Sequence, residues 1–89
     1  MATNPISMNK VEKEEKEERE ALAVRFGRHL KELREKKNIT AAELSRRTFI
    51  EKPNITRIEK GGINPSLFVL KKLADGLEIT LEELLRDFK

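Results

Sequence analysis

The sequence predicts an all-α domain of five helices, and three observations support this prediction. Apolar residues recur at spacings of three and four along most of the chain, which is the period of a helix with one buried face. Threonine or serine precedes several of these stretches, twice with a glutamate three residues later, as at a helix N-terminus. No stretch alternates apolar and polar residues as a strand does. A chain of 89 residues makes one domain with a modest core.

The first core helix carries its apolar residues in one stripe. Leu22, Phe26, Leu30 and Leu33 are separated by four, four and three residues, so they share one helix face. The helix is expected to stop near residues 37–38, and the lysines in its last turn suit the negative end of the helix dipole.

A second helix is expected to begin after Thr40. Thr40 and Glu43 have the spacing of a capping box, in which the threonine oxygen accepts from the third amide and the glutamate reaches back. A short junction, "TFI", separates this helix from the next. The residues expected to point inward are Ala41, Leu44 and Ser45.

The third helix is expected to run from Lys52 to Lys60, with Ile55 and Ile58 pointing inward. Glu51 then takes the N-cap position, and Pro53 falls in the first turn. Proline is tolerated there because the amides of the first turn lack partners within the helix. Gly61 is placed to end the helix in a left-handed conformation.

Two further short helices follow. Ser66 is the expected N-cap of the fourth, which should end near Gly76, and Thr80 with Glu83 forms a second capping box before the fifth. The apolar stripe of the fourth helix is Leu67, Leu70, Leu73, Ala74 and Leu77, and that of the fifth is Leu81, Leu84, Leu85 and Phe88.

The N-terminal residues have a different composition. Residues 1–8 are expected to be disordered, and "NKVEKEEKEERE" from Asn9 onward is almost entirely charged, with Val11 its one apolar residue. Asn9 with Glu12 matches a helix start. We interpret this stretch as a solvated helical arm or a frayed tail. The chain therefore divides into a charged N-terminal extension, 1–20, and a helical domain, 21–89.

The net charge of +3 is unevenly distributed along the chain. Residues 1–20 hold four Lys or Arg and six Glu, for a net −2, whereas residues 25–61 hold eleven against five acidic residues, for a net +6. A basic cluster on a small domain fits a surface that contacts nucleic-acid phosphates. The alternative is a solvated surface with an incidental bias.

Several classes of function find no support in the residues. The chain has no cysteine, and nothing near His29, its one histidine, has metal-ligand spacing. No catalytic grouping or phosphate-cradling loop is present, so we expect neither an enzyme nor a cofactor. No apolar run is long enough for a membrane span, and the first residues lack a secretory pattern. We therefore expect a cytoplasmic protein without membrane association.

From Phe26 to Leu85 the chain resembles the Xre/Cro–C1-type helix-turn-helix domain of bacterial and phage regulators. The stretches that carry the resemblance are "LKELREKKNIT", "AELSRRT", "NITRIEKG", "INPSLFVLKKLADGLEIT" and "LEELL". Together they span about two-thirds of the chain, in the order and at the spacing of that family. The resemblance implies a lambda-repressor-like fold in which helix 52–60 enters the DNA major groove.

The resemblance also implies which residues touch double-stranded DNA. Lysine and arginine suit guanine, asparagine suits adenine, and proline offers only an apolar contact, such as to a thymine methyl group. Plain solvation of this face is the alternative. The expected base contacts are Lys52, Pro53, Asn54, Thr56 and Arg57, and the expected phosphate contacts are Thr40, Ala41, Arg46, Arg47, Lys60, Gly62 and Asn64.

Three further positions matter by resemblance. Arg34 and Glu59 match a buried ion pair of the family, which would hold the recognition helix against the scaffold. Many relatives have glutamine at Ala41, which alanine cannot replace as a phosphate contact. Many have glycine at Phe49, where phenylalanine is strained if φ is positive, unless the turn relaxes and the ring joins the core.

The resemblance implies a sequence-specific transcriptional regulator, expected to be a homodimer that acts as a repressor or autoregulator, as phage repressors and restriction–modification controllers do. One alternative is an antitoxin that binds a toxin or other protein partner, with residues 9–20 as the partner-binding segment. Another is a protein-interaction module that keeps the fold without binding DNA. The residues considered for a dimer surface are Leu81, Leu84, Leu85 and Phe88.

Overall fold

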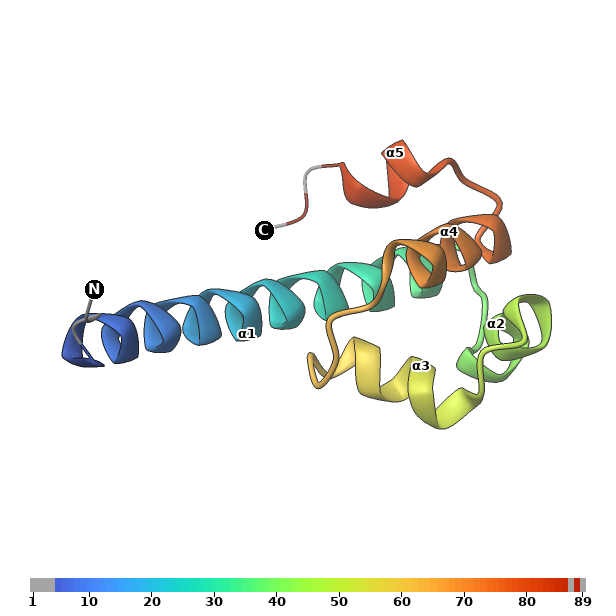
Figure 1. Ribbon diagram of the computed structural model, residues 1–89. Coiled ribbons are helices and arrows are strands. Elements are labelled where there is room, and N and C mark those ends of the chain that lie inside the picture. The colour runs from blue at the N-terminus through green and yellow to red at the C-terminus, as the bar shows by residue number, and fades with distance from the viewer. Residues whose placement is uncertain (1–4, 87, 89) are drawn as a thin grey trace.

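The computed structural model describes the backbone of residues 5–86 and 88, and the side chains of residues 9–86 and 88. Its helices are α1 (Pro5–Lys36), α2 (Ala41–Thr48), α3 (Lys52–Glu59), α4 (Leu67–Gly76) and α5 (Leu81–Leu85). No strand occurs among the described residues, so the all-α prediction is confirmed. Helices α2 to α5 gather around the C-terminal half of α1, while its N-terminal half projects away from them (Figure 1).

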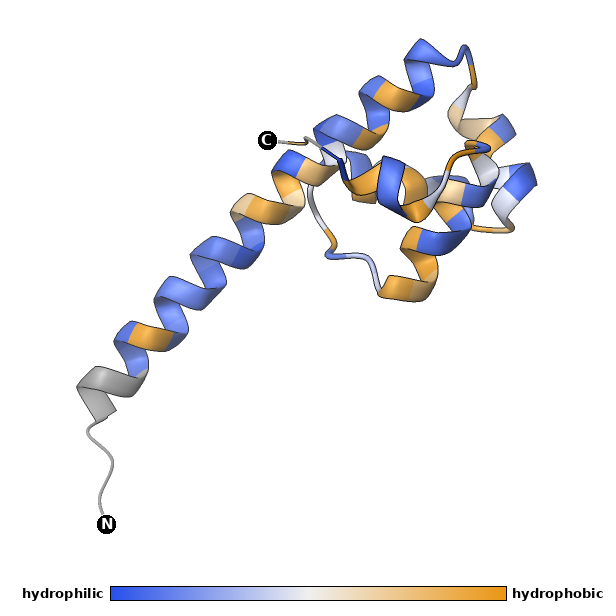
Figure 2. Cartoon of the chain, turned by 90° about the horizontal axis from the view of Figure 1, so that it is seen from above, coloured by the Kyte–Doolittle hydropathy of each residue, from blue (hydrophilic) through white to orange (hydrophobic). Residues whose placement is uncertain are grey.

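The projecting half of α1 is a solvated helix, and its predicted start was wrong. Every side chain from Asn9 to Glu20 is exposed, and almost every residue in this stretch is hydrophilic (Figure 2). The helix already includes Pro5, so Asn9 lies inside it and does not cap it, and residues 5–8 are helical where we expected disorder. The rest of that expectation, on residues 1–4, lies outside the described residues. Because α1 runs without a break from the arm into the domain, the division at residue 20 remains a prediction.

The buried face of α1 is rotated from the predicted stripe. Phe26 and Leu30 are buried as expected, but Leu22 keeps 43% of its surface exposed, and Ala23 is buried in its place. Gly27 completes this face because α3 crosses α1 there at very short range. The buried core consists of Phe26, Leu30, Ile39, Leu44, Ile55, Ile58, Leu73, Ala74, Leu77 and Leu84.

Helix α4 buries one side and exposes its first turn. Leu73, Ala74 and Leu77 are fully buried, whereas Leu67 is 70% exposed, so its assignment to the inward stripe was wrong. Leu67 is the first residue of α4, and the buried residues of the helix all lie in its later turns. Phe68, beside it, is exposed to the same extent.

Local side-chain bonds define the helix ends as predicted, with one exception. The side chains of Thr40, Ser66 and Thr80 each accept a hydrogen bond from the third amide of the helix they precede. At Thr80 the box is complete, because the Glu83 carboxylate accepts from the Thr80 amide in return. These bonds hold the pKa of Glu83 below its ordinary value. At Thr40 the glutamate does not reach back, since Glu43 instead binds two arginines.

Four helix ends are followed by a residue with left-handed φ, namely Asn38, Phe49, Gly61 and Glu78, and two of these bear on the sequence predictions. Gly61 adopts φ +80° after α3, as predicted. Phe49 adopts φ 60° after α2, so the turn keeps the conformation that favours glycine. Its ring is 89% exposed, which excludes the alternative in which the turn relaxes and the ring packs in the core.

Candidate nucleic-acid interface

Helix α3 presents a polar face that is free of core contacts. Ile55 and Ile58 are buried on one side of the helix, as expected. Of the residues predicted to contact bases, Lys52, Pro53, Asn54 and Arg57 are exposed and Thr56 is half-buried. The exposed set contains two cations, one amide and one apolar ring. This combination can offer hydrogen bonds to base edges and an apolar contact in the same groove.

The first turn of α3 accommodates proline without distortion. Glu51 is the N-cap, with φ −60° and ψ 140°, and Pro53 follows within the first two helical positions. The Asn54 amide donates to the Glu51 carbonyl at 2.9 Å, so the backbone is already turned at this point. Pro53 therefore stabilises the entry of the helix and leaves its ring exposed beside Lys52 and Asn54.

An ion pair anchors the far end of α3 to α1. Arg34 donates to the two carboxylate oxygens of Glu59 at 2.7 and 3.0 Å, and a third donor of its guanidinium reaches the Ile39 carbonyl at 2.9 Å. The side chains of Arg34 and Glu59 are only 11% and 8% exposed. The hydrogen bond to Glu59 is the main reason why the pKa of Arg34 is raised. A bidentate pair of this kind sets the orientation of α3 on the scaffold.

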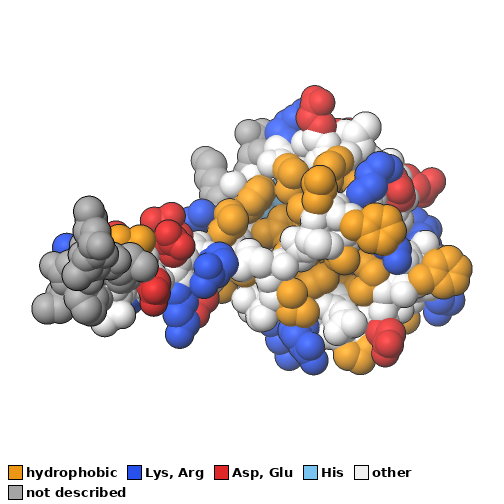
Figure 3. Space-filling model, in the orientation of Figure 1, with side chains coloured by type: hydrophobic (Ala, Val, Ile, Leu, Met, Phe, Trp, Pro, Cys, Tyr) orange, Lys and Arg blue, Asp and Glu red, His pale blue; other side chains and the backbone are white. Residues whose placement is uncertain are grey.

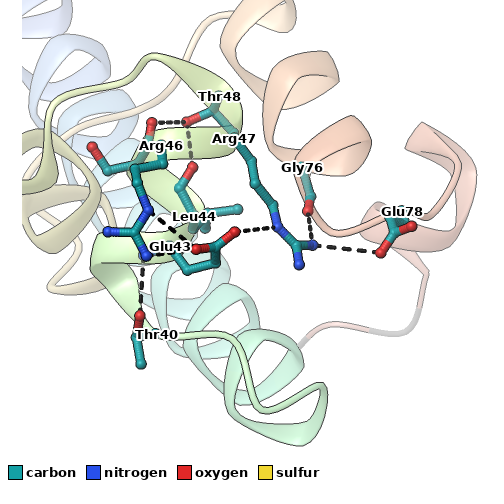
Figure 4. Close-up of polar contacts among 9 residues, drawn as sticks. Thr40, Glu43, Leu44, Arg46, Arg47, Thr48, Gly76 and Glu78 are labelled. Carbon is teal, nitrogen blue, oxygen red and sulfur yellow. Dashed lines mark hydrogen bonds and ion pairs between the residues drawn. The ribbon is translucent and has the colours of Figure 1, made fainter.

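The two arginines of α2 have different partners: Arg47 connects α2 to the end of α4, whereas Arg46 binds within α2 (Figure 4). Arg47 donates to the Gly76 carbonyl at the end of α4 at 3.0 Å, to Glu43 at 3.0 Å and to Glu78 at 3.5 Å. Arg46 pairs with Glu43 at 2.6 Å, and 69% of its side chain remains exposed. The pKa of Glu43 is below its ordinary value, chiefly because of the hydrogen bonds from Arg46 and secondly because of the one from Arg47.

The remaining residues predicted to contact phosphates lie at the start of α2 and after α3. Thr40 is exposed but its hydroxyl oxygen already accepts from the Glu43 amide at 3.0 Å, and Ala41 is half-buried. Lys60 and Gly62 are exposed, and Lys60 is the cation of the group. Asn64 donates its side-chain amide to the Arg19 carbonyl at 3.1 Å, which ties this loop to α1.

Sequence reasoning missed the side chains that hold the turn between α2 and α3. The Thr48 hydroxyl donates to the Leu44 carbonyl at 2.8 Å and accepts from the Ile50 amide at 3.1 Å. The Ser45 hydroxyl donates to the Ile50 carbonyl at 2.6 Å. Hydroxyl residues in the last turn of a short helix are the signal that could have identified them, because they bond readily to nearby backbone groups.

His29 was also missed, and it fastens α5 to α1. Its Nε2 lies 2.7 Å from the Leu84 carbonyl oxygen, and its ring centroid lies 5.4 Å from that of Phe88. Leu84 is fully buried in the monomer, so it cannot contribute to a dimer surface, and its place in the group considered for that surface was wrong. Leu81 and Phe88 are half-buried, whereas Leu85 is exposed.

The described part of the chain offers neither a metal site nor a membrane span. Residues 5–86 and 88 contain no cluster of three or more His, Cys, Asp or Glu that could bind a metal ion. No helix in the same part combines the length and the apolar composition needed to span a bilayer.

Comparisons with known proteins agree with this geometry. A family profile described as helix-turn-helix matches residues 30–84. Control protein C.MunI of Mycoplasma sp is 36% identical over 69 residues, which cover 76% of this chain and 93% of that protein. The crystal structure of the restriction-modification controller protein C.AhdI from Aeromonas hydrophila shares 34% identity and a TM-score of 0.70. The match covers 73% of this chain and 98% of that one.

Proposed function

The chain belongs to the helix-turn-helix family of DNA-binding transcriptional regulators, and we propose that it is a controller protein of a restriction–modification system. The observation that carries the proposal is the extent of the similarity. Two controller proteins match this chain over 93% and 98% of their own lengths, at 36% and 34% identity. A restriction–modification controller is a narrower function than that of the helix-turn-helix family as a whole. Neither relative is a toxin partner by name, and the antitoxin alternative is not favoured.

In the proposed complex, α3 lies in the major groove of double-stranded DNA. The exposed side chains of Lys52, Asn54 and Arg57 supply the hydrogen bonds to base edges, and Pro53 supplies an apolar contact. Arg34 and Glu59 contribute indirectly. Their ion pair holds α3 at a set angle on α1 and so orients the side chains that contact the bases.

Phosphate contacts then set the position of the domain on the duplex. We assign this role first to Arg46 and Lys60. Both residues are exposed, and in the sequence Arg46 precedes α3 and Lys60 follows it. The polar or small residues Thr40, Ala41, Gly62 and Asn64 can add backbone or amide contacts. Arg47 is the weakest of the predicted contacts, because its guanidinium is bound to Gly76 and Glu78.

The active species is proposed to be a cytoplasmic homodimer that represses or autoregulates its own promoter by occupancy. A two-fold dimer would place its α3 helices about 34 Å apart, one turn of DNA. Its operator would then be an inverted repeat. We propose no enzymatic activity, because the residues form a binding surface and the family is a DNA-binding one.

Selection of purified full-length protein against a random duplex library tests this function. The expected result is an enriched inverted repeat that also occurs upstream of the chain's own gene, beside genes for a methyltransferase and an endonuclease. The Arg57→Ala variant should lose the preference at particular base positions, whereas the matched variant Lys10→Ala, on the projecting arm, should retain it. Binding that is equally tight on every duplex and merely salt-sensitive would contradict a sequence-specific regulator.

A further inference from the structure

The projecting arm of α1 lies outside the residues that match the family, so the match does not explain its function. The family match begins at Leu30, whereas the arm comprises residues 5–20. At 1.5 Å per residue the arm is about 24 Å long, and its side chains from Asn9 onward are exposed. A solvated helix of this length is marginally stable by itself, because most helices in proteins are stabilised by packing one face.

One face of the arm carries an apolar and acidic stripe. Val11, Glu15, Glu18 and Leu22 are spaced by four, three and four residues. At about 100° per residue they lie within one side of the helix. Val11 and Leu22 are 50% and 43% exposed, so each end of this stripe offers apolar surface to a partner. We call these four residues the arm stripe, although Leu22 lies two residues beyond the arm, where α1 enters the domain.

Leu22 joins the arm stripe to an apolar groove on the body of the molecule. The groove has a volume of about 120 Å³ and lies where α1, α4 and α5 meet. Asn64 is its one polar lining residue, and its apolar lining consists of Leu22, Phe26, Pro65, Leu70, Leu85 and Phe88. Hydrophobic side chains gather over this part of the body, whereas charged side chains dominate the described part of the arm (Figure 3). Because Leu22 belongs to both surfaces, a molecule seated in the groove also lies beside the arm.

The first turns of α4 carry the surface that would complement the arm stripe. Leu67 and Phe68 are both 70% exposed. Lys71 and Lys72 follow them four residues later, one helical turn along. The Lys71 ammonium pairs with Asp75 within the same helix, and 57% of its side chain stays exposed, so it remains accessible to a second carboxylate. The Lys72 ammonium lies 5.3 Å from the centre of the Phe68 ring. We call Leu67, Phe68, Lys71 and Lys72 the α4 knob. Along α4, the α4 knob changes from apolar to basic residues within one turn. Along α1, toward the N-terminus, the arm stripe changes from the apolar Leu22 to the acidic Glu18, also within about one turn.

We propose that in the homodimer the arm stripe of one protomer packs against the α4 knob of the other, reciprocally across a two-fold axis. Both surfaces belong to the same chain and carry complementary charges, so together they can form the self-complementary patch that a two-fold interface requires. Leu67 and Phe68 enter the partner's groove beside Leu22, and the two lysines meet Glu15 and Glu18. The arm does not bind DNA in this arrangement. Its net charge of −2 opposes contact with phosphates.

The inference rests on the proposed homodimer, and sedimentation of the full-length protein without DNA tests it separately from operator binding. Glu15→Lys with Glu18→Lys should raise the dimer dissociation constant about tenfold or more, because each lost pair counts twice across the two-fold axis. The matched variant Glu17→Lys with Glu20→Lys makes the same change of charge on the opposite side of the arm. It should leave the dissociation constant within about twofold of wild type.

A charge exchange separates a specific pairing from a general effect of charge. Lys71→Glu with Lys72→Glu should weaken the dimer alone, and combining it with Glu15→Lys and Glu18→Lys should restore most of the lost affinity. Circular dichroism checks that each variant is folded. A wild-type monomer at all concentrations, equal effects of the two arm variants, or no restoration by the exchange would each overturn the proposal. An inverted repeat selected from the DNA library would still support the proposed function in those cases.

Discussion

The Ile58 carbonyl of α3 lies against Gly27 of α1 so closely that a Cβ added at Gly27 would stand 2.3 Å from its oxygen. Cβ atoms do not approach a carbonyl oxygen at that distance, so the two helix backbones touch where they cross. Because the oxygen belongs to the backbone, it cannot move aside without moving α3. This contact therefore sets the distance between the recognition helix and the scaffold.

Gly27→Ala is expected to destabilise the fold, by about 1–3 kcal/mol, since the overpacking outweighs the better helix propensity of alanine. It should also weaken operator binding, because α3 is displaced. Chemical denaturation measures the first effect. The control for stability is Gly62→Ala, whose Cβ would meet the flexible Arg57 side chain at 3.1 Å and the Arg57 carbonyl oxygen at an ordinary contact distance of 3.4 Å. Equal stability of Gly27→Ala and wild type would show that the helices separate without cost.

Replacing Arg34 should be among the most costly single changes. Arg34→Ala leaves the Glu59 carboxylate buried without its partner, and we expect a loss of about 3–5 kcal/mol in the free energy of unfolding. Replacing both residues together, with Arg34→Met and Glu59→Leu, should cost less than either single change to alanine. Urea unfolding of the three variants measures this. A loss below about 1 kcal/mol for Arg34→Ala would mean that water takes the arginine's place.

Phe49→Gly is expected to stabilise the protein. The residue has φ 60° and its ring is 89% exposed, so glycine removes left-handed strain while sacrificing little burial. We expect a gain of about 0.5–1 kcal/mol after the greater freedom of glycine in the unfolded chain is counted. Phe68→Gly is the matched control. It removes an exposed ring from helical backbone in α4 and should destabilise by about 1 kcal/mol. Effects of the same sign at both positions would contradict this account.

The exposed face of α3 should separate base readout from phosphate contact. Arg57→Ala and Lys52→Ala are each expected to cost about 1–3 kcal/mol on the selected operator and to relax particular base positions. Lys60→Ala should weaken binding to all duplexes alike and reduce the salt dependence by about one ion. Titrations at several salt concentrations measure both effects. If Lys60→Ala changes the selected sequence, the division between the two groups is wrong.

The capping box of α5 should make a pH-dependent contribution to stability. Bonds from the Thr80 amide and hydroxyl hold the pKa of Glu83 below its ordinary value. A lowered pKa means that the contribution is complete above the ordinary pKa of a glutamate and is lost as pH falls through the lowered one. The difference in melting temperature between wild type and Glu83→Gln should therefore shrink on acidification from pH 7. Glu82→Gln, exposed in the same turn, should show a smaller difference that does not follow this course.

Local signals predicted most of the helix boundaries. The capping residues Thr40, Ser66 and Thr80 bond to amides three residues away, so their effect is contained in a few residues of sequence. The exposed polar face of α3 also followed from the positions of Ile55 and Ile58. The start of α1 could not be found in this way, because a charged stretch without an apolar period gives no clear first residue.

Other features depended on residues distant in the chain. Arg47 could not be separated from Arg46 as a phosphate contact, because its position is decided by Gly76, 29 residues away. His29 finds its partner at Leu84, 55 residues away. No pattern of spacing reports such pairs, so the structural bonds of Arg47 and His29 became visible only in the folded domain.

By itself, then, the sequence determined an all-α chain of five helices and where four of them begin. These follow from periodicity and capping, which act within a few residues. The tertiary structure alone decided that Leu22 and Leu67 stay exposed, that Phe49 turns its ring to solvent, and that an acidic arm stands beside an apolar groove. The physical reason is that the burial of a side chain depends on which helix crosses above it, and that crossing is fixed by the packing of the whole domain.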